Sequence, residues 1–133
     1  MSDNGVMTLQ SRFSVRETVD RLAQKVTSLG LIVFARIDHM AGAAQAGLAL
    51  RPTELLIFGN PNGGAPLMQD RQIAGIDLPV KALAYEDTDG KTWLAYNDAI
   101  WIAKRHGLGA KSADAVKAIA AGLAMVTRYA AEG

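Results

Sequence analysis

A chain of 133 residues is long enough to bury one hydrophobic core without the help of disulfides or a structural metal. Half of its residues are hydrophobic, a fifth are charged and the net charge is +1, so the composition is globular and gives no reason to expect a nucleic-acid partner. Because the chain has no cysteine, thiolate metal sites, iron–sulfur clusters and cysteine nucleophiles are excluded.

The N-terminal sequence MSDNGVMTLQSR has no apolar core behind a basic region, and no run of the chain approaches eighteen consecutive apolar residues. This pattern predicts neither a secretory signal nor a membrane-spanning helix. We therefore expect a cytoplasmic protein without a membrane partner. We also expect a single domain over residues 1–133, with an ordered core over 6–131 and a flexible N-terminus over 1–5.

The first elements carry clear periodic signals. Apolar and polar residues alternate from Val6 to Phe13, as expected for a half-buried strand. Ser14 and Glu17 then match the capping box of a helix start, and apolar residues recur at helical spacing until Gly30. The sequence therefore predicts a strand followed by a helix that ends near Gly30.

A second strand and a short helix are predicted next. The segment from Leu31 to Ile37 is apolar and β-branched, which favours a strand buried on both sides. Asp38 is placed to cap a helix that begins at His39 and ends before Pro52. That helix carries a stripe of small and apolar residues, which predicts close packing against the sheet: Met40, Ala43, Ala44, Gly47 and Leu48.

The third strand, from Glu54 to Phe58, runs into a segment rich in proline and glycine, Gly59 to Gly64. Such residues are typical of a turn, and Pro66 suits the first turn of a helix that follows it. The segment resembles an anion-binding loop in its glycines, but the phosphate-loop and dinucleotide-binding motifs are absent. We expect it to be a structural turn with polar side chains beside it, Asn60, Asn62 and Asp70.

The last elements complete the fold prediction. Two strands, Leu78 to Asp87 and Lys91 to Tyr96, are separated by Thr88-Asp89-Gly90, a hairpin signal. Asn97 is expected to cap a helix that ends at Gly107, and Ser112 a final alanine-rich helix. The order predicts an α+β fold, in which helices pack on a mixed or mainly antiparallel sheet of about five strands.

Several motifs in this chain resemble one known family. They are Asp38-His39, the run RPTELLIFGNP from Arg51 to Pro61, Pro66-Leu67-Met68, Asp77-Leu78-Pro79-Val80-Lys81, Tyr96-Asn97-Asp98 and Arg105-His106. Over roughly residues 13–108 the sequence is similar to the prokaryotic family called domain of unknown function 302. The resemblance implies an α+β fold that often self-associates, with a homodimer favoured, and it implies no established activity. The chain departs from the family at Ala65, where threonine is frequent, so a contact made by that threonine is not expected here.

Four polar residues are candidates for a ligand site. His39 at a helix N-terminus is favoured as a neutral imidazole, which suits metal ligation or proton acceptance. Asn60 has an amide that both donates and accepts, Lys81 lies on one face of its strand and Tyr96 closes the next, so a pocket lined by these four residues is one interpretation. The structural alternatives are a histidine that bonds across a strand end, a turn-forming asparagine, a solvated lysine and a tyrosine over the core edge.

Three hypotheses of function follow. The leading one is a self-associating domain that binds a small molecule near His39, Asn60 and Tyr96. The second is an enzyme in which His39 is the general base and Asp38 or Asp98 orients it, although Asp38 is better explained as a helix cap. The third is an interaction module that packs its alanine-rich C-terminal helix on a partner.

A metal site is a further alternative to these hypotheses. It would need the fold to bring together His39, His106, Asp98 or Glu86, because the spacing of the two histidines is not a metal motif. His106, near a helix end, has a plainer explanation as a group that interacts with the helix dipole. The sequence identifies no cofactor and leaves open whether the protein is an enzyme.

Overall fold

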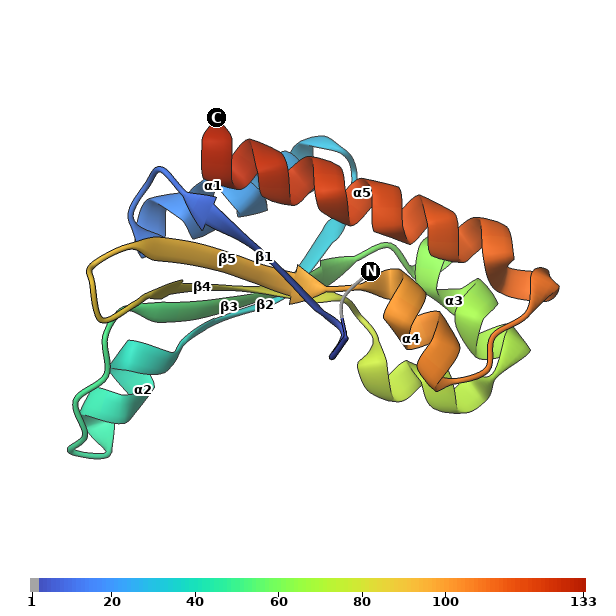
Figure 1. The fold of residues 1–133 in the computed structure, drawn as a ribbon, viewed down its shortest axis with the longest axis horizontal. Helices are drawn as coiled ribbons and strands as arrows, with labels where there is room; N and C mark the ends of the chain where they lie inside the picture. Colours follow the sequence, from blue (N-terminus) through green and yellow to red (C-terminus); the bar gives the residue numbers. More distant parts are fainter. Residues whose placement is uncertain (1–2) are drawn as a thin grey trace.

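The structure, a computed structural model that describes residues 3–133, is a five-stranded antiparallel sheet with helices packed on it (Figure 1). The strand order is β1-β5-β4-β3-β2, with every neighbouring pair antiparallel. The strands are β1 (Val6–Ser11), β2 (Ile32–Asp38), β3 (Thr53–Gly59), β4 (Lys81–Glu86) and β5 (Thr92–Asn97). The helices are α1 (Val15–Ser28), α2 (His39–Gln45), α3 (Pro61–Asp70), α4 (Ala99–Arg105) and α5 (Ala113–Glu132), with 3₁₀ helices η1 (Gln72–Asp77) and η2 (Ala110–Ser112). The predicted α+β class and antiparallel sheet are confirmed.

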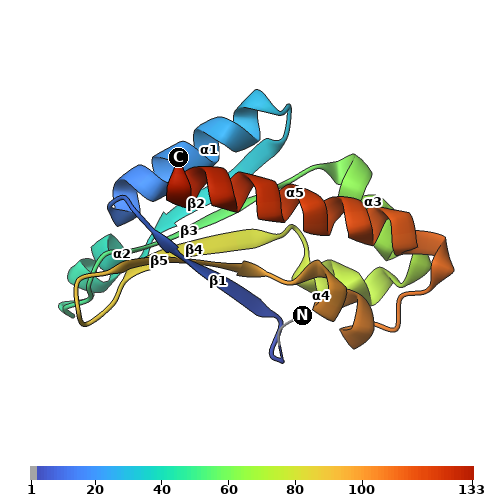
Figure 2. The ribbon, with the colours of Figure 1, turned by 45° about the horizontal axis from the view of Figure 1, so that its top comes forward.

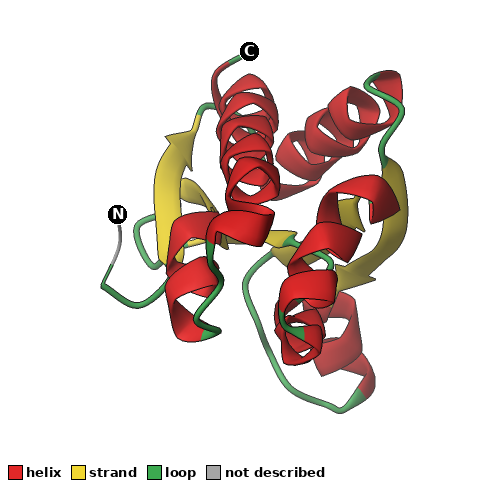
Figure 3. Ribbon diagram, turned by 90° about the vertical axis from the view of Figure 1, so that its right-hand side faces the viewer, coloured by secondary structure: helices red, strands yellow, loops and turns green. Residues whose placement is uncertain are grey.

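Helices α1 and α5 lie together on one face of the sheet and enclose the core (Figures 1 and 2). The view from the end that carries α3 and α4 shows both long helices on the same side of the strands (Figure 3). The strand register points a set of fully buried side chains toward these helices: Leu56, Phe58, Ala82, Ala84 and Leu94. Their neighbours along the strands, such as Leu55 and Leu83, point to the opposite face and are half-buried. The sheet therefore has one covered and one open face, which explains the alternating pattern of its strands.

The start of α1 follows the predicted capping box. The backbone N–H of Glu17 donates to Oγ of Ser14 at 3.1 Å, which satisfies one of the free donors of the first turn. The apolar stripe of α1 is fully buried against the sheet at Val19, Leu22 and Val26. Periodicity and cap agree here, so the helix was predictable from the sequence.

Strand β2 was predicted to be buried on both sides, and this prediction is wrong. It forms the edge of the sheet, and its side chains Ile32, Phe34 and Ile37 are exposed. A register irregularity between Val33 and Ala35 interrupts its pairing with β3. An apolar run does not distinguish a central strand from an edge strand, because that difference depends on which strands lie beside it.

Helix α2 also differs from its prediction. Asp38 does cap it, since the N–H of Ala41 donates to Oδ1 of Asp38 at 2.9 Å. However, none of its seven residues is buried, and the helix projects from the sheet instead of packing closely on it (Figure 1). It ends at Gln45, well before Pro52, and the chain turns at Gly47 with a φ of +77°, a conformation that glycine adopts readily.

The proline- and glycine-rich segment is mostly helical, which corrects the predicted turn. Asn60 is the N-cap of α3, because its Oδ1 accepts a hydrogen bond from the N–H of Asn62 at 3.0 Å. Pro61 occupies the first helical position, where its missing N–H costs nothing, and Pro66 lies inside the helix. An anion-binding loop is therefore not formed at residues 59–64.

Two further capping predictions differ from the structure, one in its residue and one in its hydrogen bond. Asp98 caps α4 by accepting from the N–H of Ile100 at 3.0 Å, whereas Asn97 accepts from the N–H of Lys81 at 2.8 Å. Ser112 occupies the predicted N-cap position of α5 but makes no capping hydrogen bond to it. Short polar residues in a row are each acceptable caps, so the sequence does not determine which of them is used.

The predicted flexible N-terminus, residues 1–5, falls partly on residues 1 and 2, which lie outside the described residues. Gly5 is fixed in the fold: its carbonyl accepts from the N–H of Asp98 at 2.9 Å. Its φ is +83°, and a Cβ built on it would lie 2.5 Å from the ring of Trp101. These contacts hold Gly5 against the start of α4.

Candidate functional site

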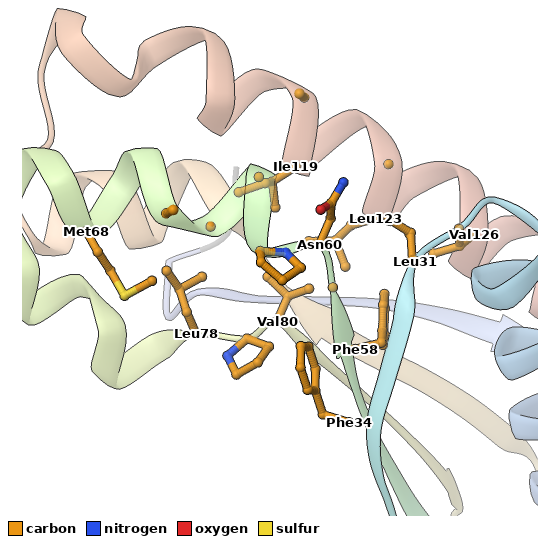
Figure 4. Close-up of a pocket in the computed structure, with 18 residues that line it drawn as sticks. Leu31, Phe34, Phe58, Asn60, Met68, Leu78, Val80, Ile119, Leu123 and Val126 are labelled. Atoms are coloured by element: carbon orange, nitrogen blue, oxygen red, sulfur yellow. The ribbon is translucent and has the colours of Figure 1, made fainter.

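A pocket of about 450 Å³ lies at the end of the sheet where β3 passes into α3 (Figure 4). Its walls come from β2 and β3, helix α3 from Pro61 to Met68, residues 78–80 and the middle of α5. Among its larger side chains are Phe34, Phe58, Leu78, Ile119 and Leu123. The volume is typical of a small-molecule site.

The lining of the pocket is almost wholly apolar. Among the described residues that line it, Asn60 has the only polar side chain, and no lining residue is charged. Oδ1 of Asn60 is already used to cap α3, which leaves the side-chain NH₂ as the group that can bind a ligand. A charged ligand would lose hydration without gaining a partner here, so the lining suits an uncharged aliphatic ligand or the aliphatic part of a larger one.

Three glycines in helices line the pocket, namely Gly63 and Gly64 in α3 and Gly122 in α5. None of them has a positive φ, so the backbone does not require glycine. A Cβ would lie 3.9 Å from Ile119 at Gly63 and 3.8 Å from Leu78 at Gly64, and at Gly122 it would meet nothing within 4 Å. Packing does not require glycine either.

These glycines also weaken their helices, because glycine in a helix interior costs about 1 kcal/mol relative to alanine. A Cβ at Gly122 would face open space, whereas a Cβ at Gly63 or Gly64 would make ordinary van der Waals contacts. The absence of a side chain therefore leaves room at the pocket wall most clearly at Gly122.

The structure does not bring the four predicted ligand-binding residues together. Asn60 lines the pocket. Lys81 and Tyr96 lie at the same end of the sheet but on opposite faces, since Tyr96 pairs with Ala82, the neighbour of Lys81, and packs against the core. His39 follows Asp38, which is level with the start of β3, so it lies at the other end of the sheet.

The structure also separates the residues that were proposed to act with His39. Its side chain is exposed, and the carboxylate of Asp38 beside it is bonded to the N–H of Ala41. Asp98 caps α4 at the opposite end of the sheet, so it cannot orient His39. Of the two proposed acid partners, one is a helix cap and the other is remote.

His106 has a structural partner that the sequence did not reveal. Its Nε2 is hydrogen-bonded to Asp77, and both carboxylate oxygens of Asp77 accept from Nη1 of Arg105 at 3.0 Å. The side chain of His106 is buried in this arrangement, which ties α4 to η1. Within residues 3–133 no group of three or more histidine or carboxylate side chains is placed to hold a metal ion. Helix α2, which begins at His39, and helix α4, which His106 caps, lie at opposite ends of the sheet (Figure 1).

Asp70 fixes the far ends of the two helices that line the pocket. Its Oδ2 accepts from the N–H of Gly109 at 3.0 Å and from Oγ of Ser112 at 2.7 Å. The hydrogen bond from Gly109, followed by that from Ser112, lowers the pKa of Asp70 below its ordinary value. The charged carboxylate therefore joins the C-terminus of α3 to the residue before α5.

Sequence reasoning missed most of this pocket, because it searched for polar and titratable groups. Residues such as Phe34, Leu78 and Ile119 carry no functional signal in a sequence. The one available signal was glycine within helical patterns, at Gly63, Gly64 and Gly122, and the first two were interpreted as turn residues.

A family model and a solved structure both relate this chain to the same family. The family described as "Domain of unknown function DUF302" matches residues 7–126. A crystal structure of an uncharacterised conserved DUF302 protein from Bacillus stearothermophilus superimposes with a TM-score of 0.83 at 20% identity, and covers 96% of this chain and 98% of that one. At that identity the likeness shows the fold.

Closer relatives carry a different name. The protein "Fluoride-specific ion channel FluC 1" of Brucella suis is 55% identical over 129 residues, which is 97% of this chain but 51% of the relative. "Fluoride-specific ion channel FluC 2" of Brucella melitensis is also 55% identical over 97% of this chain and 48% of its own length. The chain thus spans about half the length of these relatives. None of the helices within residues 3–133 is long and apolar enough to cross a membrane.

Proposed function

This chain belongs to the family described as domain of unknown function DUF302, and from that premise we propose that it is a binding domain for a small apolar molecule held between α3 and α5. The observation that carries the proposal is the pocket itself, which has an apolar lining and, at Gly122 of α5, a wall residue without a side chain that faces open space. Alanine at such a position would fill part of the space and would stabilise the helix. We therefore interpret the space as a binding pocket and not as a packing defect.

The chemistry of the lining specifies the ligand class. An aliphatic chain fits an apolar pocket of about 450 Å³ without charged side chains. The NH₂ of Asn60 offers a donor at the rim for a hydroxyl or carbonyl oxygen. The ligand is therefore an uncharged molecule with an aliphatic body and an oxygen at one end.

A fluorescence titration tests this proposal. N-phenyl-1-naphthylamine, an uncharged apolar dye, should brighten when it binds the pocket, and dodecanol should displace it. Gly122→Leu fills the space in front of α5 and should abolish the signal. Gly42→Leu is the matched control, because Gly42 is also helical, has nothing within 4 Å of a Cβ and lies outside the pocket.

The proposal fails if the dye binds Gly122→Leu as well as the unaltered protein, or if dodecanol does not compete. A circular dichroism spectrum of Gly122→Leu separates loss of the pocket from loss of the fold. The leucine meets open space, so the variant should keep its helix content.

Self-association, with a dimer favoured, and a cytoplasmic location remain part of this proposal. The open face of the sheet supports self-association, since its apolar side chains Leu55, Ile57 and Leu83 are only half-buried. Apolar area of this kind gains stability when a second surface covers it. Light scattering over a wide concentration range should give a dimer mass, and a monomer mass at every concentration would contradict it.

The Brucella relatives support a second candidate function, as a domain that works with a fluoride channel. The match covers nearly all of this chain but about half of each relative, so in those proteins the equivalent region is joined to a further segment. The purified chain should co-elute in detergent with the part of the Brucella suis protein that it does not match. Separate elution would contradict this function and leave the pocket proposal untouched.

A further inference from the structure

The 3₁₀ helix η1 presents two isoleucines to solvent. The side chains of Ile73 and Ile76 are 71% and 72% exposed, and they are the most exposed of the large hydrophobic residues in the described chain. Residues three apart in a 3₁₀ helix lie directly above one another, so the two form one apolar ridge. Large apolar side chains grouped in this way mark a contact surface.

The ridge is held rigidly in the fold. Between the two isoleucines, Ala74 is fully buried, and its N–H donates to the carbonyl of Arg71 at 3.0 Å. At the other end of η1, Asp77 is bonded by Arg105 and His106 of α4. The isoleucines are therefore exposed on a 3₁₀ helix that is anchored at both ends, and not on a frayed segment.

Basic side chains directly precede η1 and lie on α4 and η2. Arg71 immediately precedes η1, Arg105 bonds its last residue, and α4 and η2 add Lys104 and Lys111, all with exposed side chains. The acidic groups near the ridge are Asp70 and Asp77, and both are engaged in hydrogen bonds within the fold. Arg105 is paired with Asp77, and Arg71 and Lys111 lie close enough to Asp70 to lower its pKa, so these four basic and two acidic side chains leave a formal net charge of +2 to face an external partner.

We propose that η1 docks this domain on the surface of a membrane that contains anionic lipids. Ile73 and Ile76 enter the interfacial layer, while the surrounding arginine and lysine side chains contact lipid phosphates. A second copy of the chain is a poorer partner, because a two-fold contact through η1 would bring the same cations together. A peripheral contact of this kind needs no spanning helix, and the sequence-based expectation of no membrane partner considered only spanning segments.

The ridge is also continuous with the pocket. Met68 lines the pocket and packs on η1, where a Cβ built on Gly75 would lie 3.0 Å from its sulfur. Aliphatic molecules partition into membranes, so docking at η1 places the rim of the pocket beside the phase that contains them (Figure 4). This last step rests on the proposed function, whereas the docking itself does not.

Vesicle flotation tests the docking. The protein should float with vesicles of phosphatidylcholine and phosphatidylglycerol, should bind pure phosphatidylcholine weakly, and should be released by high salt. The double variant Ile73→Ser/Ile76→Ser should lower the partition coefficient at least about tenfold, because two buried side chains are lost. The control is Leu48→Ser/Leu50→Ser, which removes exposed leucines between α2 and β3 and should leave flotation unchanged.

Equal flotation of the isoleucine variant and the unaltered protein would overturn the proposal, as would equal binding to both vesicle types. If the isoleucine variant changes the mass in light scattering from dimer to monomer but still floats, the ridge is a protein interface and the proposal is wrong. Gly122→Leu should still float. Salt-sensitive flotation that depends on Ile73 and Ile76, in a protein that binds no dye, would leave docking standing and remove the ligand proposal alone.

Discussion

Ser112 donates a hydrogen bond from its Oγ to Oδ2 of Asp70 at 2.7 Å, and thereby connects two helices that are distant in the sequence. Asp70 ends α3, and Ser112 stands directly before α5. Both helices carry pocket-lining glycines. A polar contact outside the pocket thus joins the two helices that form part of its walls.

Asp70→Asn should make the protein less stable at neutral pH and less sensitive to acid. The pKa of Asp70 is lowered in the fold, first by the N–H of Gly109 and then by Ser112. A carboxylate with a lowered pKa contributes stability above its unfolded pKa, and this contribution is lost as pH falls through the folded value. Thermal melts between pH 7 and about pH 3 should show a shallower decline for the variant.

Ser112→Ala is the companion variant. It removes one donor to Asp70 and should reduce the melting temperature at neutral pH in the same direction. If Asp70→Asn declines with acid as steeply as the unaltered protein, the carboxylate does not act as described.

The fluorescence of Trp93 should report the protonation of Asp87 in the hairpin between β4 and β5. Oδ2 of Asp87 accepts from the indole N–H of Trp93 at 2.8 Å, and this bond is the largest cause of the lowered pKa of Asp87. In a Trp101→Phe background, Trp93 fluorescence should change with a midpoint below about pH 4. Adding Asp87→Asn should remove that transition, and its persistence would assign the change to another group.

Gly122→Ala should stabilise the protein by about 1 kcal/mol, because a helical glycine without a conformational role is replaced. It should also weaken binding of the apolar dye, since the methyl group enters the pocket. Gly42→Ala, in α2, should give a similar stability gain without a change in dye binding. Urea unfolding and dye titration measure both effects. A destabilised Gly122→Ala would mean that the glycine has a structural role.

His39→Ala should change neither stability nor ligand binding. His39 is exposed at the start of α2, at the end of the sheet away from the pocket. Dye titration and thermal melts of the variant check this. Loss of binding would place a second ligand site at the α2 end, as the sequence-based interpretation proposed.

The sequence alone determined the elements whose signals are local. The capping box at Ser14 and the apolar stripe of α1 gave its position, alternation gave β1, and the Asp89-Gly90 turn gave the hairpin. These features depend on hydrogen bonds and periodicities within a few residues, so a single segment contains the needed information. The class of the fold and the family resemblance followed from their order.

Only the tertiary structure decided the site. Whether β2 is central or an edge, whether α2 packs, and whether His39 meets Asn60 all depend on which segments become neighbours. The pocket is a space between segments that are distant in the sequence, including α3 and α5, so no local sequence pattern indicates it. Glycine in a sequence favours the prediction of a turn. The positions of Gly63, Gly64 and Gly122 on the pocket wall are apparent only once helices α3 and α5 are known.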